Sequence, residues 1–112
     1  MNEEIAVTHP EETDALNRLI HEPARLRIMT LLSGVEQADF NFLLNTLGLT
    51  KGNLSAHTDR LERAGYIAIA KSFQGKLPHT AYRLTRSGHE ALAAQWAALD
   101  GIRRLKAHQP KK

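Results

Sequence analysis

The chain of 112 residues contains no cysteine. This absence excludes disulfide bonds and thiolate metal sites, and it is compatible with a reducing compartment, so we expect the cytoplasm. No apolar run approaches the roughly 18 residues that a membrane-spanning helix needs. The first twelve residues, MNEEIAVTHPEE, are acidic and polar, which does not fit a secretory signal. We therefore expect a chain that has no membrane partner.

The sequence also lacks the usual signatures of catalysis and metal binding. It has no Ser/His/Asp set, no paired carboxylates and no glycine-rich phosphate loop at a useful spacing, so we predict that it is not an enzyme. Six histidines are present, but none forms an H-x3-H pair, and without thiolates we predict neither a metal site nor a cofactor. The formal net charge of +3 and the pI near 9.5 are a mild hint toward polyanionic partners.

Length and composition fit one globular domain, with 42% hydrophobic and 24% charged residues. We expect a flexible N-terminus at 1–10, one domain at 11–106 and a basic tail at 107–112. Apolar spacing and capping residues predict a mainly α fold with a β-hairpin. About five helices and a two- to three-stranded sheet are expected: helices at 11–20, 23–33, 42–47, 51–64 and 86–106, and hairpin strands at 66–73 and 79–85 around a turn at 74–78.

The segment LTKGNLSAHTDRLERAGYI, residues 49–67, carries most of the functional argument. Leu54, Thr58 and Leu61 recur at helical spacing, and Thr50 is suited to cap the helix that they predict. The Gly52-Asn53 pair resembles a turn signal. At the second helical position, however, a glycine disturbs the helix little and lets its backbone approach a ligand closely.

Only Gly-Leu-Thr separates the predicted helices 42–47 and 51–64, for which we expect Asn41 and Thr50 as caps. A short, glycine-containing connection between two such helices is typical of a helix-turn-helix. The hairpin that follows directly would then be the wing of a winged helix.

Three blocks of the sequence carry a family resemblance, and together they cover about residues 17–97. HEPARLRIMTLL resembles the opening helix of ArsR-type winged-helix regulators. FNFLLNTLGLTKGNLSAHTDRLERAGYI resembles the helix-turn-helix of the ArsR/MarR superfamily, and KSFQGKLPHTAYRLTRSGHEAL resembles its wing and last helix. The nearest pattern is a small subgroup with T-x-G-N-L-S-x-H and a K-S-F wing. The resemblance implies a DNA-binding transcriptional regulator, normally a homodimer built by its first and last helices.

The helix over 51–64 is expected to place its outer arc in the major groove of double-stranded DNA. Asn53 suits adenine, and Arg60 suits guanine or phosphate. Asp59 either accepts from a cytosine amino group or pairs with Arg63, and the sequence leaves both open. The wing should lie along the backbone or in the minor groove. The predicted DNA-binding residues are Thr50, Lys51, Gly52, Asn53, Ser55, Ala56 and Arg60 in the helix, and Lys71, Gln74, Lys76 and His79 in the wing.

An apolar stripe on the terminal helices predicts the dimer interface, with Leu16, Leu19, Leu92, Trp96, Leu99 and Ile102 as its members. We interpret His57 as a packed, hydrogen-bonded side chain rather than a base reader. Two alternatives stay open: a winged helix that binds proteins, and a non-specific nucleic-acid-binding protein, of RNA or of the nucleoid. The sequence leaves any small-molecule effector unknown.

Overall fold

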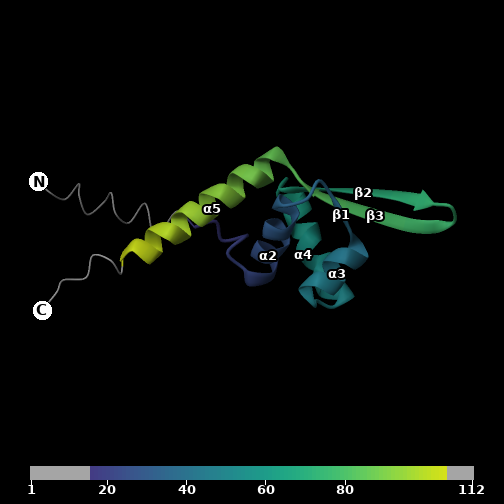
Figure 1. The fold of residues 1–112 in the computed structure, drawn as a ribbon, viewed down its shortest axis with the longest axis horizontal. Coiled ribbons are helices and arrows are strands. Elements are labelled where there is room, and N and C mark those ends of the chain that lie inside the picture. The colour runs from purple at the N-terminus through teal and green to yellow at the C-terminus, as the bar shows by residue number, and fades with distance from the viewer. Residues whose placement is uncertain (1–15, 106–112) are drawn as a thin grey trace, which may run out of the picture.

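The computed structural model describes residues 16–105, which form four helices and a three-stranded sheet (Figure 1). The wing and the last helix extend from the helical body in opposite directions. The elements are α2 (Pro23–Ser33), β1 (Ala38–Asp39), α3 (Phe40–Leu47), α4 (Lys51–Arg63), β2 (Ile67–Gln74), β3 (Leu77–Leu84) and α5 (Arg86–Leu105).

The core lies where α2, α3 and α4 meet the base of the sheet and the first half of α5. Apolar side chains from all of these elements are buried there together, and their burial is the main favourable contribution to folding. The core includes Ile20, Ile28, Met29, Leu32, Leu43, Leu54, Leu61, Ile67, Tyr82, Leu84 and Leu92. This arrangement of a helix-turn-helix followed by a β-hairpin is the predicted winged-helix fold.

The sheet is antiparallel in the order β1-β3-β2, and most of it is the hairpin of β2 and β3. Their register runs without interruption from Ile67 opposite Leu84 to Gln74 opposite Leu77. Only Gly75 and Lys76 form the turn, and the positive φ of Gly75, 66°, fits a type II′ hairpin. The turn predicted over 74–78 is therefore too long, because Leu77 already pairs in β3.

Side-chain caps fix the helix starts. The hydroxyl of Thr50 accepts from the Asn53 N–H at 3.1 Å, which confirms the predicted cap of α4. The prediction for α3 was wrong by two residues. The Asp39 carboxylate, rather than Asn41, accepts from the Phe42 N–H at 2.8 Å, so α3 begins at Phe40.

The helix predicted at 11–20 is not present in its described part. Residues 16–17 are irregular and 18–21 form a turn, because the Asn17 side-chain oxygen accepts from the N–H groups of Leu19 and Ile20 at 3.0 and 3.4 Å. Such a local bond competes with helical bonding. Residues 11–15 lie outside the described residues, as do the predicted loose ends at 1–10 and 107–112 and the last predicted position of α5, Lys106. None of the helices within 16–105 has the length and apolar character to cross a bilayer.

The start of α5 packs tightly against the residue that precedes β2. A Cβ built on Gly88 would lie 2.0 Å from the Tyr66 carbonyl oxygen and 2.8 Å from Leu84 Cδ1. The glycine is therefore required by a close approach of the two backbones. Thr85 supports the same junction, because its hydroxyl donates to the Gly65 carbonyl at 2.6 Å and accepts from the Gly88 N–H at 2.9 Å.

The buried face of α5 differs from the predicted leucine stripe. Gly88, Leu92, Gln95 and Ala98 are buried, while Trp96 is 46% exposed. Gln95 is fully buried because its side-chain oxygen accepts from the Asn17 N–H at 2.8 Å. The Asn17 amide in turn donates to the Tyr66 hydroxyl at 2.8 Å. Gln95, a polar side chain whose hydrogen bonds are satisfied, is thus buried where the apolar periodicity predicted Trp96.

Candidate nucleic-acid interface

Helix α4 presents one buried and one exposed face, as its sequence pattern predicted. Leu54, Thr58 and Leu61 are buried in the core. The Thr58 hydroxyl is satisfied within the helix, where it donates to the Leu54 carbonyl at 2.9 Å. The whole predicted contact set of this helix is exposed on the other side: Thr50, Lys51, Gly52, Asn53, Ser55, Ala56 and Arg60.

The first turn of α4 is open on its outer side. A Cβ on Gly52 would meet no atom within 4 Å, so this stretch of backbone is uncovered. The first N–H groups of a helix have no partner within the helix and favour anions such as phosphate. Asn53 follows Gly52 directly and is also exposed. A backbone that can approach closely thus stands beside an amide that suits base edges.

The wing is a two-stranded arm that carries only positive formal charge. Its residues 67–84 include Lys71, Lys76 and Arg83 but no Asp or Glu. Of the predicted wing contacts, Lys71, Gln74 and Lys76 are exposed, and His79 is partly buried. Such an arm fits a polyanion that runs past the helix-turn-helix.

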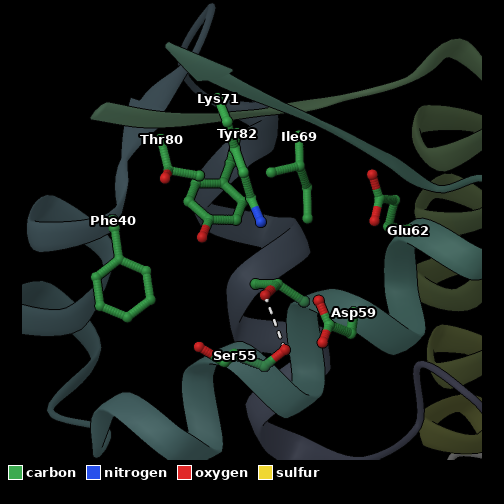
Figure 2. A pocket seen from close by; sticks show the side chains of 9 residues that line it. Phe40, Ser55, Asp59, Glu62, Ile69, Lys71, Thr80 and Tyr82 are labelled. Carbon is green, nitrogen blue, oxygen red and sulfur yellow. Dashed lines mark hydrogen bonds between the residues drawn. The ribbon is translucent and has the colours of Figure 1, made fainter. Parts of the chain in front are cut away.

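A groove of about 530 Å³ separates α4 from the sheet (Figure 2). The Lys71 side chain descends into it beside the Tyr82 ring, toward α4. Burial is the main cause that raises the pKa of Tyr82. The hydrogen bond with the Thr58 hydroxyl lowers this pKa, and the carboxylates of Asp59 and Glu62 raise it further. The groove is lined by Phe40, Ser55, Thr58, Asp59, Glu62, Ile69, Lys71, Thr80 and Tyr82.

Asp59 had two interpretations from the sequence. Among the ion pairs of residues 16–105, none joins Asp59 to Arg63. Its carboxylate instead lines the groove between α4 and the wing. The position favours a direct role toward whatever α4 contacts, and hydrogen-bond acceptance from a cytosine amino group stays a prediction.

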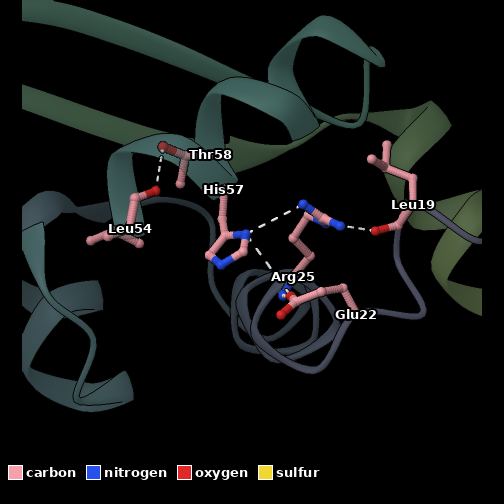
Figure 3. A network of polar contacts seen from close by, with 6 residues as sticks. All are labelled: Leu19, Glu22, Arg25, Leu54, His57 and Thr58. Carbon is pink, nitrogen blue, oxygen red and sulfur yellow. Dashed lines mark hydrogen bonds and ion pairs between the residues drawn. The ribbon is translucent and has the colours of Figure 1, made fainter. Parts of the chain in front are cut away.

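A polar network clamps α4 to the start of α2 (Figure 3). His57 Nδ1 lies 3.4 Å from Arg25 Nη1 and 3.9 Å from Glu22 Oε1. Arg25, which is buried, also donates through Nε to the Leu19 carbonyl at 2.7 Å. His57 is thus a packed, hydrogen-bonded side chain, as interpreted. The structural role of Arg25 was missed, because its partner Leu19 lies in a turn that the sequence assigned to a helix.

The residues predicted for a dimer interface do not share one environment. Leu92 belongs to the chain's own core, where little of its side chain remains exposed. Leu16, Leu19 and Leu99 are partly buried. Trp96 and Ile102 are 46% and 37% exposed. Trp96 also lines an apolar groove with Leu26, Arg27, Thr30, Leu31 and Leu47. Within 16–105, no three His, Cys, Asp or Glu side chains are grouped so that they could hold a metal ion.

Comparison with known proteins places this site in a family. The chain is 34% identical over 74 residues to an uncharacterized protein of Methanocaldococcus jannaschii, covering 66% of this chain and 80% of that protein. A transcriptional regulator homologue from Pyrococcus horikoshii has the same fold, with a TM-score of 0.76 and 29% identity over 80% of this chain and 89% of the other.

The transcriptional repressor CouR, solved on a 23-mer DNA duplex, shares the fold with a TM-score of 0.65. It is 20% identical, over 92% of this chain and 76% of its own. The Pyrococcus horikoshii homologue supports the regulator part of the predicted resemblance, and its ArsR assignment and subgroup motif stay predictions. The family model of the winged helix DNA-binding domain matches residues 24–102. The chain therefore belongs to the family of winged helix DNA-binding domains.

Proposed function

We propose that this protein is a sequence-specific, double-stranded DNA-binding transcriptional regulator that acts as a homodimer. Helix α4 lies in the major groove, and wing residues 71–80 follow the backbone or the minor groove. One observation carries the proposal: the exposed arc that begins at the bare first turn of α4 stands next to an arm without carboxylates. The CouR complex with duplex DNA supports it as a relative in fold.

The contact residues divide into two roles. Asn53 sits where an amide can pair bidentately with adenine, so it contributes to the choice of sequence. Lys71 and Lys76 carry charge without a planar pattern of donors and acceptors, so they contribute affinity and its salt dependence. Arg60 lies two helical turns beyond Asn53 on the same face of α4, and it can serve either role.

Selection of bound duplexes from a random pool, followed by titration at two salt concentrations, tests this division. We expect Lys76→Ala to weaken binding to every sequence alike and to reduce the salt slope by about one. We expect Asn53→Ala to cost about 1–3 kcal/mol at one base pair and to relax the preference there. Equal losses on selected and random DNA would reject Asn53 as a base reader.

The same titration separates the proposal from its alternatives. A protein-interaction module shows no steep, salt-dependent binding to duplex DNA. A general nucleic-acid-binding protein binds duplexes or RNA without the gap of about 10³-fold or more between specific and non-specific sites. The exposed amide and guanidinium on α4 favour sequence reading over both.

The proposed dimer rests on the far half of α5. The face that is buried at Leu92 and Gln95 continues to Ile102, which is exposed because the helix has by then passed the core. Trp96 and the apolar groove beside it offer a second surface that one domain leaves uncovered. Two copies that pair there present two α4 helices to half-sites about 10 base pairs apart, or a small multiple.

Sedimentation velocity at micromolar concentration tests the dimer. We expect the wild-type chain to have the mass of two copies and Ile102→Glu to have the mass of one, because burying an unpaired carboxylate is costly. Ala97→Glu is the matched control, since Ala97 is exposed on another face of α5 and should leave the dimer intact. A monomeric wild-type chain would contradict the pairing.

A further inference from the structure

The tip of the wing carries apolar side chains where a purely electrostatic arm would need none. Phe73 is 72% exposed and Leu77 is 71% exposed. They are the two most exposed large apolar side chains in the part of the chain that the structure describes. Both stand within two residues of the Gly75-Lys76 turn. Such exposure has no benefit for folding, so the face of the arm on which each side chain lies decides whether it can contact a partner.

The register of the hairpin separates these two side chains. Ile69, Lys71 and Thr80 line the groove beside α4, and side chains two residues apart on a strand share a face. Phe73, paired with Pro78, continues that face beyond the groove, toward the side of α4. Leu77 pairs with Gln74 and lies on the opposite face. Of the two exposed side chains, only Phe73 therefore lies on the face of the arm that borders α4.

The charge of the wing and its length indicate which partner its tip contacts. The arm has three cations, Lys71, Lys76 and Arg83, and no carboxylate, which fits a polyanion. Phe73 lies four positions beyond Ile69, which is at the edge of the core, so the strand carries it about 13 Å outward. One helical turn of DNA is about 34 Å, so the minor groove that flanks the major groove proposed for α4 lies about 17 Å along the duplex. The reach of the strand to Phe73 is thus of the same order as the distance to the flanking minor groove of the proposed duplex.

We propose that Phe73 is an apolar wedge that enters the minor groove and partly unstacks one base step. This inference rests on the proposed function and adds a second source of specificity to it. Wedges of this kind kink the duplex by roughly 20–90°. The cost of the kink is lowest at flexible pyrimidine–purine steps, so the protein selects sequence at a step to which it makes no hydrogen bond.

The test uses the full chain and a duplex chosen from the random pool, with 2-aminopurine at each candidate step and fluorophores at its ends. We expect wild-type protein to raise the 2-aminopurine fluorescence at one step and to shorten the end-to-end distance. Phe73→Ala should lose both signals and bind roughly 10-fold more weakly. Phe73→Leu should keep most of each signal, since leucine also serves as a wedge.

Leu77→Ala is the matched control, because Leu77 is equally exposed but faces away from α4. It should keep the fluorescence and the bend. Unchanged signals in Phe73→Ala, or equal losses in both variants, overturn the wedge and leave the proposed function standing. A wild-type chain that binds no duplex overturns the proposed function itself. Binding to phosphatidylserine vesicles that depends on Phe73, without any 2-aminopurine signal, assigns the tip to a membrane surface and also overturns the wedge.

Discussion

Replacing Gly88 by alanine is expected to lower the free energy of unfolding by about 3 kcal/mol or more. The new methyl group would sit 2.0 Å from the Tyr66 carbonyl oxygen, and a backbone atom cannot rotate away as a side chain can. Either α5 shifts away from the sheet or β2 changes its start. Both disturb the core around Leu84 and Leu92. Chemical denaturation, with the slope checked for two-state behaviour, measures the loss.

Gly101→Ala is the control in the same helix. A Cβ at Gly101 would meet no atom within 4 Å, so only the helix propensity of the residue changes. Alanine is more favourable there by up to about 1 kcal/mol, and we expect the variant to be slightly more stable than the wild type. If Gly88→Ala behaved like Gly101→Ala, the close approach of α5 to Tyr66 would be wrong.

Gly52→Val is expected to weaken specific DNA binding on the order of 100-fold while leaving the fold intact, a loss comparable to two base contacts. The branched side chain meets open space in the free protein, so it does not disturb α4. In the proposed complex, the same space is where the backbone meets phosphate or base edges. Fluorescence anisotropy with a selected duplex measures the affinity.

Thermal unfolding of Gly52→Val, monitored by circular dichroism, provides the control for this second variant. Its midpoint should match or slightly exceed that of the wild type, because valine suits a helix better than glycine. If Gly52→Val bound DNA with wild-type affinity, the first turn of α4 would not be the point at which the helix comes closest to DNA. A lowered midpoint would mean that position 52 packs against its own chain.

The elements that the sequence predicted well are those whose signals are local. Leu54, Thr58 and Leu61 recur on one face, and Thr50 caps its own helix, so α4 and its exposed arc followed from spacing alone. The wing was recognisable from its strand-forming residues around glycine. Whether the exposed side chains contact DNA stays a prediction, since exposure is a condition for contact and not a measure of it.

The features that were missed depend on tertiary contacts rather than on local sequence patterns. Gln95 is buried because Asn17, 78 positions away, donates to it, and no periodicity records such a bond. Arg25 is buried because Leu19 turns back to accept from it. The start of α3 was misplaced because Asp39 and Asn41 are both suitable caps, and only the pairing of Asp39 with Ala81 in the sheet decides between them.

The contact between Gly88 and Tyr66 has a consequence for the geometry of the proposed dimer. Because no side chain fits between them, a rotation of α5 about its own axis would press a neighbouring side chain of the helix against Tyr66. The contact at Gly88 therefore sets the orientation of the far end of α5 relative to the wing within each chain. A partner that binds the end of α5 is therefore held at one orientation relative to the wing.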